Sequence, residues 1–113
     1  MSAGAEPFPY EGDEALKPLV VRALRRVIDP EMALDIVGLG LVYGVRVADG
    51  RADVRITMTS AACPVIEMIV ADLEYELGEA LGPGVQVHVE VTWDPPWVPE
   101  RMTNGARAAM GWD

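Results

Sequence analysis

The chain has 113 residues, half of them hydrophobic, and carries 18 acidic against 9 basic residues for a formal net charge of −9. This acidity argues against partners that need a basic surface, which excludes nucleic acids and anionic membranes. No apolar run approaches the roughly 20 residues that span a bilayer. A lone cysteine cannot form an intramolecular disulfide, and proteins without disulfides are typical of reducing compartments. We therefore expect a cytoplasmic protein.

The first twelve residues are predicted to form no regular structure. They combine Gly4, Pro7, Pro9 and Gly12 with acidic side chains, and they have neither the basic start nor the apolar stretch of a secretory signal. We expect residues 1–12 to be a flexible tail. A chain of this length has little room for two domains, so residues 13–113 are expected to form one.

A stripe of apolar residues at helical spacing predicts the first helix, which opens at Pro18 and ends near Ile28, before Pro30. A β-hairpin follows. Its turn is Asp49-Gly50, because both residues tolerate the positive φ of a two-residue turn. On the first strand of this hairpin we expect Tyr43 to share the apolar face of the valines that follow it.

A second helix is predicted to begin after Cys63, with Pro64 at its first position, and to break at residues 82–84. Valines alternate with polar residues from Val85 to Thr92, which predicts a third strand. A short helix capped by Thr103 is expected near the C-terminus.

These elements predict an α+β fold (a two-layer α/β arrangement). It has a small three-stranded sheet with helices packed on one face, in the order helix, strand, strand, helix, strand and short helix. The pattern leaves open whether the third strand pairs parallel or antiparallel.

Cys63 is the residue whose position indicates chemistry. It precedes Pro64 at a helix start, where free backbone N–H groups and the helix dipole favour a thiolate over a thiol. A thiolate is both a nucleophile and a soft metal ligand. The alternative is that Cys63 is a small buried hydrophobic residue, which is common for free cysteines.

Four other residues could support the thiol. Thr57 and Thr59 fall on the polar side of the strand that leads to Cys63, although threonine is also an ordinary strand residue. The carboxylates of Asp29 and Glu31 could bind a hard cation or accept a proton. Asp29 stands before a proline, where a turn-forming role is the better interpretation.

The loop from Trp93 to Trp97 contains two tryptophans around Asp94 and two prolines. Prolines stiffen a loop, and tryptophans on a stiff loop either cap a core or bind a partner protein. Trp93, Asp94 and Trp97 are therefore the candidates for partner binding, and composition does not choose between the two roles.

Four segments carry a family resemblance: Asp29 to Glu31, Ile36 to Tyr43, Thr57 to Pro64, and Trp93 to Trp97 followed by Met102-Thr103. In this order and spacing the chain resembles the SufT/PaaD-type family of metal–sulfur cluster biosynthesis proteins. The resemblance implies a compact α/β fold and a role in maturing iron–sulfur proteins.

The resemblance also implies site residues. Cys63 would be the required functional thiol and the candidate ligand for a metal or cluster. Thr57, Thr59, Asp29 and Glu31 would lie nearby.

We therefore expect an accessory factor in iron–sulfur cluster assembly or transfer, a maturation factor rather than a turnover enzyme. One thiolate cannot hold a cluster that usually takes four protein ligands, so no tightly bound cofactor is expected, only a transient cluster or iron. The expected partners are iron–sulfur assembly proteins and client apo-proteins. A homodimer is one way to bring two Cys63 thiolates together.

Two alternative functions stay open. One is a protein-binding adaptor that acts through the loop from Trp93 to Trp97. The other is a thiol-dependent enzyme with Cys63 as its nucleophile, which needs a general base. The only histidine, His88, is expected on a solvated strand face with no obvious route to Cys63.

Overall fold

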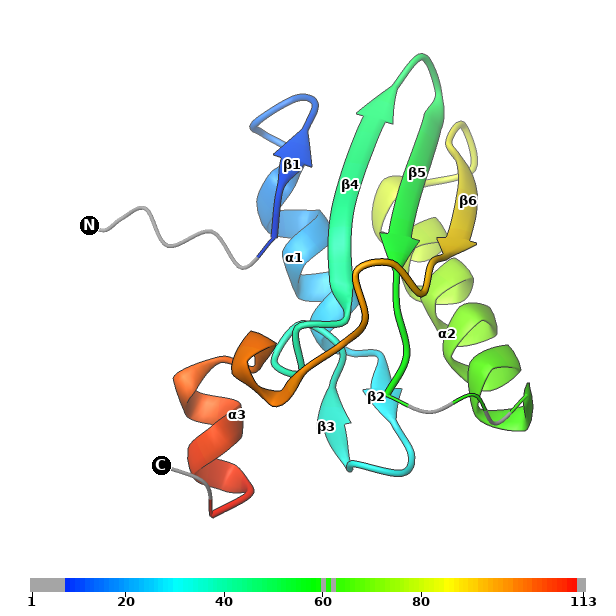
Figure 1. The fold of residues 1–113 in the computed structure, drawn as a ribbon. Helices are drawn as coiled ribbons and strands as arrows, with labels where there is room; N and C mark the ends of the chain where they lie inside the picture. Colours follow the sequence, from blue (N-terminus) through cyan, green and yellow to red (C-terminus); the bar gives the residue numbers. More distant parts are fainter. Residues whose placement is uncertain (1–7, 60, 62, 112–113) are drawn as a thin grey trace.

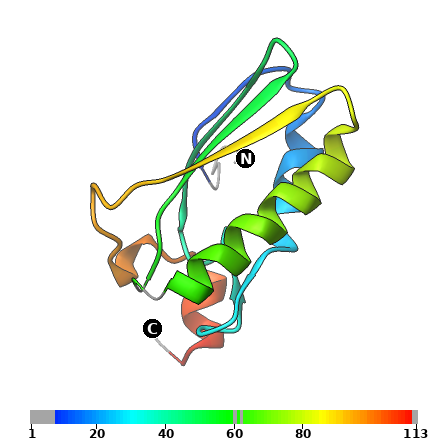
Figure 2. The same cartoon turned by 90° about the vertical axis from the view of Figure 1, so that its right-hand side faces the viewer.

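The computed structural model describes residues 8–59, 61 and 63–111. The strands of its main sheet are, in spatial order, β1 (Tyr10–Glu11), β4 (Val42–Ala48), β5 (Arg51–Ile56) and β6 (Gln86–Val91). The pairs β1–β4 and β5–β6 are parallel, whereas β4 and β5 run antiparallel. Helices α1 (Lys17–Arg25) and α2 (Cys63–Leu81) lie together on one face of this sheet (Figures 1 and 2).

The remaining elements lie beyond the lower end of the sheet in Figure 1. Strands β2 (Ile28–Asp29) and β3 (Leu34–Asp35) form a separate antiparallel ribbon. A 3₁₀ helix (Pro99–Arg101) and helix α3 (Asn104–Ala109) follow the loop that leaves β6. These elements extend the core past the ends of β4 and β5.

The core lies between the two long helices and the sheet, because both helices turn an apolar stripe inward. Among its fully buried side chains are Val20 and Leu24 of α1, Ile69, Leu73 and Leu77 of α2, and Val54 and Ile56 of β5. The valines of β6 are half-buried against this cluster, while Gln86, His88 and Glu90 are exposed. Each long helix therefore stabilises the fold through the face that its sequence pattern predicted.

Several predictions from the sequence are confirmed. The fold is a mixed α/β arrangement with helices on one face of a sheet. Asp49 and Gly50 both have positive φ (54° and 73°), as the predicted two-residue turn requires. The Thr103 hydroxyl oxygen accepts a hydrogen bond from the Ala106 N–H (3.1 Å), which makes Thr103 the predicted cap of α3.

The predicted strand count and order are wrong. Within the described part of the chain, the main sheet has four strands rather than three, and the β2–β3 ribbon adds two more short strands. Strands of two residues carry no alternation that a sequence pattern could reveal. The parallel pairing of β5 with β6 answers the question that the pattern had left open.

Part of the predicted flexible tail belongs to the fold. Phe8 is only 3% exposed and packs into the core, and Val45 donates its backbone N–H to the Pro9 carbonyl (3.0 Å). The strand β1 then pairs with β4, with Tyr10 beside Val45. The burial of one large aromatic side chain outweighs the local preference of glycine and proline for loops. Residues 1–7 lie outside the described residues.

Two predicted details also change. Helix α1 ends at Arg25 instead of near Ile28, because Ile28 and Asp29 pair with β3. The register of β4 against β5 shifts between Val42 and Gly44, which is a β-bulge. A bulge changes which side chains point to which face, so Tyr43 leaves the apolar face and lies on the open face of the sheet.

The glycines before β4 hold the C-terminal segment. The Gly38 carbonyl accepts a hydrogen bond from the Thr103 N–H (2.9 Å). Gly40 has a φ of +76°, and a Cβ at this position would overlap the backbone carbonyl of Arg101. Glycine is therefore required at position 40 both for its backbone angle and for the close approach of residues 99–103.

We predict that Gly40→Ala lowers the free energy of unfolding by about 2 kcal/mol or more, because the new Cβ meets both a left-handed backbone and a main-chain carbonyl. Chemical denaturation measures the change. The matched control is Gly78→Ala, since Gly78 lies within α2 with open space around it. The control should leave stability unchanged or raise it by up to roughly 1 kcal/mol. Equal stabilities for the two variants would contradict the packing described for Gly40.

Candidate functional site

The start of α2 is where the sequence places the functional thiol. Cys63 is the first residue of α2, and Pro64 follows it. The first backbone N–H groups of a helix have no partner within the helix, so this position carries partial positive charge. The side chain of Cys63 lies outside the described part of the structure.

Asp29 is the buried carboxylate of this region. Its side chain is 1% exposed, and its Oδ1 accepts hydrogen bonds from the N–H groups of Glu31 (2.8 Å) and Met32 (3.3 Å). The Asp29 carbonyl accepts a third bond from the Ala33 N–H (2.7 Å). Asp29 therefore forms the turn between β2 and β3, which is the role that its place before a proline favoured.

Thr59 is brought to the same carboxylate. Its hydroxyl donates to Asp29 Oδ2 (3.3 Å), so the two residues meet although 30 positions separate them. Thr59 stands between the end of β5 and the start of α2. The hydrogen bond fastens the segment that leads to Cys63 onto the β2–β3 ribbon.

Thr57 and Glu31 take different positions. Thr57 is fully buried rather than on a solvated strand face, and it donates its N–H to the Leu41 carbonyl (2.8 Å), which continues the pairing beyond β5. Its buried hydroxyl has no hydrogen-bond partner among the residues that the structure describes. Glu31 is exposed, and only its backbone N–H contacts Asp29. Of the four supporting residues, Asp29 and Thr59 are therefore the pair whose side chains are hydrogen-bonded to each other.

The loop after β6 divides its two tryptophans between two roles. Trp97 packs against the core and donates its Nε1–H to the Leu39 carbonyl (2.7 Å). The Tyr43 hydroxyl donates to the Pro95 carbonyl (2.7 Å), so the loop is fastened at two points. Trp93 is 49% exposed. Trp97 thus caps the core, whereas Trp93 remains the candidate for partner binding.

Asp94 is exposed and belongs to a local turn. Its N–H donates to the Thr92 hydroxyl oxygen (3.3 Å), and its carbonyl accepts from the same hydroxyl (3.2 Å). These contacts involve the backbone of Asp94 rather than its carboxylate.

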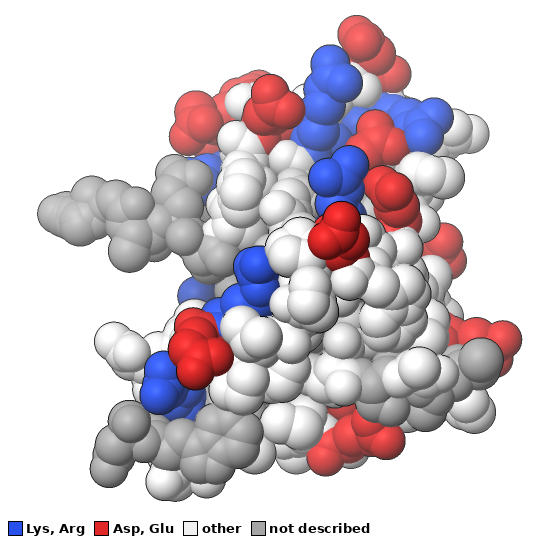
Figure 3. Space-filling view, viewed as in Figure 1, with Lys and Arg blue, Asp and Glu red and all other residues white. Residues whose placement is uncertain are grey.

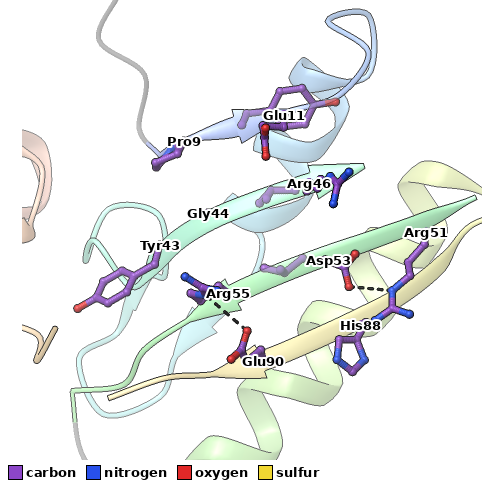
Figure 4. Close-up of a pocket in the computed structure, with 13 residues that line it drawn as sticks. Pro9, Glu11, Tyr43, Gly44, Arg46, Arg51, Asp53, Arg55, His88 and Glu90 are labelled. Carbon is purple, nitrogen blue, oxygen red and sulfur yellow. Dashed lines mark hydrogen bonds and ion pairs between the residues drawn. The ribbon is translucent and has the colours of Figure 1, made fainter. Parts of the chain in front are cut away.

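A hollow of about 750 Å³ lies on the open face of the sheet (Figure 4). Ion pairs line it, Arg51 with Asp53 (2.8 Å) and Arg55 with Glu90 (3.4 Å). Figure 3 shows basic and acidic side chains interleaved on this face. This hollow lies on the side of the sheet away from the helices. His88 lines it, and the start of α2 does not. The sequence pattern did not predict this hollow, because the bulge between Val42 and Gly44 places Tyr43 among its lining residues against the expected alternation.

Tyr10 lies at the rim of this hollow. Burial, and then the neighbouring carboxylates of Asp13 and Glu14, raise the pKa of the Tyr10 phenol above its ordinary value. Its hydroxyl donates to the Asp13 carbonyl (2.8 Å). The phenol therefore stays neutral at physiological pH and serves as a hydrogen-bond donor.

Two absences concern the described residues alone. Among the side chains that the structure describes, which do not include that of Cys63, no three His, Asp or Glu groups gather closely enough to hold a metal ion. In the same part of the chain, no helix combines the length and apolar character needed to cross a bilayer.

We predict that Asp29→Ala destabilises the fold by about 1–3 kcal/mol, because two backbone N–H groups and the Thr59 hydroxyl lose a buried acceptor. Asp29→Asn retains an oxygen that accepts from the backbone and should cost less. Urea denaturation of both variants tests this. An Asp29→Ala protein as stable as the parent chain would contradict the anchoring role.

We predict that Trp97→Phe lowers stability by about 1 kcal/mol, since the Leu39 carbonyl loses its donor while an aromatic ring is kept. Trp93→Phe is the matched control and should stay within roughly 0.5 kcal/mol of the parent chain, as is usual for exposed positions. The two midpoints of thermal unfolding give the comparison. A larger loss of stability for Trp93→Phe than for Trp97→Phe would contradict the assignment of Trp97 as the residue that caps the core.

Comparison with known proteins gives one consistent result. The family model described as "Iron-sulfur cluster assembly protein" matches residues 18–91. The chain is 40% identical over 101 residues to "Fe-S protein maturation auxiliary factor YitW" of Bacillus subtilis (strain 168), covering 88% of this chain and 97% of that protein. It is 42% identical over 87 residues to "Fe-S protein maturation auxiliary factor SufT" of Staphylococcus aureus (strain USA300), covering 75% and 97%.

A solved structure agrees with these sequence matches. The crystal structure of a domain of unknown function, DUF59, from Bacillus anthracis matches with a TM-score of 0.79 and 42% identity, covering 87% of this chain and 93% of that one. The family model spans well over half of the chain, and both relatives align along nearly their full length. This chain therefore belongs to the iron–sulfur cluster assembly protein family.

Proposed function

We propose that this protein is an accessory factor that helps iron–sulfur clusters reach client apo-proteins, with Cys63 as its functional thiol. The observation that carries the proposal is the position of the only cysteine at the first residue of α2, in a chain of the iron–sulfur cluster assembly family. The relatives named as Fe-S protein maturation auxiliary factors support the same process.

The chemistry proposed for Cys63 is that of a soft ligand for iron held as cargo. Backbone N–H groups at a helix start favour the thiolate, which is the form that binds metal. Thiolates are the usual protein ligands of iron–sulfur clusters. A thiol in this position would therefore bind a cluster edge or an iron ion more readily than a cysteine elsewhere in the chain.

The neighbouring contacts support a fixed position for this helix start. Asp29 holds Thr59, and Leu41 holds Thr57, so the chain is fastened at two points between β5 and α2. A metal ligand binds best when its backbone is already in place, because little entropy is then lost on binding. We assign Asp29 and Thr59 a positioning role and no direct part in binding the cargo.

Having a single thiolate also limits how the protein would hold its cargo. A cluster commonly takes four protein ligands, so a single chain supplies too few for a stable resident cluster. Cys63 would instead share the cargo briefly with a donor or a client, whose own thiolates complete the ligand set. The transfer is a ligand exchange in which one Fe–S bond to Cys63 breaks as a bond to the client forms.

We predict that Cys63→Ser lowers the activity of iron–sulfur enzymes several-fold in cells that lack the native copy, because a hydroxyl is a far weaker ligand for iron than a thiolate. The fold should stay within roughly 0.5 kcal/mol of the parent chain. Enzyme activity and iron content of the client proteins are the measurements. Full activity in the Cys63→Ser strain would overturn the proposal.

The exposed Trp93 favours a second candidate, an adaptor that works by docking alone. Trp93→Ala in the same cells separates the two functions. An adaptor loses client activation with Trp93→Ala and keeps it with Cys63→Ser, whereas a thiol-based carrier shows the opposite pattern. Anaerobic mixing of the purified protein with iron and sulfide, followed by absorption spectra of both variants, shows whether Cys63 contacts the cargo.

A further inference from the structure

The two edges of the main sheet differ in length and in protection. Strand β1, at one edge, has two residues and follows Pro9. Strand β6, at the other edge, has six residues in an uninterrupted register with β5. It contains neither proline nor lysine, the residues with which proteins commonly block pairing at an edge. Figure 2 looks onto this side of the molecule, with β6 and α2 in front.

Hydrogen bonding within the sheet fixes which backbone groups face the free edge. Gln86 and Thr92 donate their N–H groups to Gly50 (2.9 Å) and Ile56 (2.8 Å) on the β5 side. Backbone direction alternates along a strand, so His88 and Glu90 also point their N–H groups toward β5. The N–H and C=O groups of the three valines of β6 therefore face outward, where no strand of the described chain pairs with them.

The sequence of β6 is complementary to itself in one antiparallel register. When Val89 lies opposite Val89 of a second copy, the outward N–H and C=O groups of the valines are hydrogen-bonded to each other. His88 then lies opposite Glu90 of the second copy, and Glu90 opposite its His88. These are non-hydrogen-bonded pairs, with Cα atoms about 4.5 Å apart and side chains in close contact.

Neighbouring registers are less favourable. A shift of the second copy by two residues in one direction places His88 opposite His88, and a shift in the other direction places Glu90 opposite Glu90. Two carboxylates directly opposite each other destabilise a strand pair. In the register that pairs His88 with His88, Glu90 lies opposite Gln86 and gains no imidazole partner. The register centred on Val89 alone places each imidazole beside a carboxylate.

We propose that β6 pairs antiparallel with β6 of a second copy of this chain, in the register centred on Val89, to form a continuous eight-stranded sheet. Each imidazole N–H donates to the carboxylate of Glu90 across the interface. Glu90 can accept this bond in addition to its contact with Arg55 (3.4 Å), because a carboxylate has about four acceptor sites. In Figure 4, His88 and Glu90 lie on the same open face of β6, at the edge of the sheet.

The pairing is tested by disulfide trapping in the full-length chain with Cys63→Ser as background. One protein carries His88→Cys, and a second, tagged for size, carries Glu90→Cys. The two are mixed under reducing conditions and then oxidised. Positions 88 and 90 lie within disulfide distance in the proposed register, whereas two copies of the same variant are offset by two residues, beyond about 7 Å.

The expected result is a covalent dimer from the mixture and essentially none from either variant alone. A covalent dimer from His88→Cys alone would mean a shifted register and would overturn the proposal. Monomer in every sample would overturn it as well, as would sedimentation of the parent chain as a monomer at its highest soluble concentration. Both substitutions are at exposed positions, so the fold stays intact. The experiment involves no cluster cargo, so its outcome is independent of the proposed function.

Discussion

The buried carboxylate of Asp29 is the contact on which the candidate site depends. A carboxylate with 1% exposure is costly to bury unless its oxygens are hydrogen-bonded. Here one oxygen accepts two backbone N–H groups of the β2–β3 turn, and the other accepts the Thr59 hydroxyl. Asp29 therefore joins two parts of the chain that share no strand pairing, and the start of α2 follows directly from the second part.

The C-terminal segment is held by different means. Its contacts are made mainly to backbone groups around Gly38 and Gly40, where the absence of side chains lets residues 99–103 approach. The Arg101 guanidinium also lies 4.5 Å from the centre of the Tyr43 ring. Trp97 completes the attachment through the Leu39 carbonyl. Gly38 and Gly40 thus serve the packing of the C-terminal segment in this fold.

The sequence pattern predicted the elements whose side chains alternate regularly. The two long helices, the hairpin with its Asp49-Gly50 turn and the valine strand β6 all bury one regular face, so periodicity revealed them. Periodicity could not predict the elements that depend on a single contact. Strand β1 depends on the burial of Phe8, and the β2–β3 ribbon depends on the carboxylate of Asp29. The bulge that turns Tyr43 to the open face interrupts the two-residue alternation of side chains along β4, on which the prediction was based.

The same limit applies to the candidate site. The position of Cys63 at a helix start could be predicted from Pro64 alone, because proline is suited to the first turn. The contact of Thr59 with Asp29 crosses 30 positions and could not be predicted from spacing. Thr57 was misplaced because the alternation of β5 was extended past Ile56, where the chain enters the interior.

The parallel pairing of β5 with β6 has a consequence for how a partner would approach. Two parallel strands end at the same border of a sheet, so the chain leaving β5 toward Cys63 and the chain leaving β6 toward Trp93 set out side by side. The Thr92 N–H donates to the Ile56 carbonyl (2.8 Å), so a hydrogen bond joins the two segments where they leave the sheet. Loops at the carboxyl ends of parallel strands are where α/β proteins commonly bind ligands. A protein bound at this border would therefore lie against both the exposed indole of Trp93 and the start of α2.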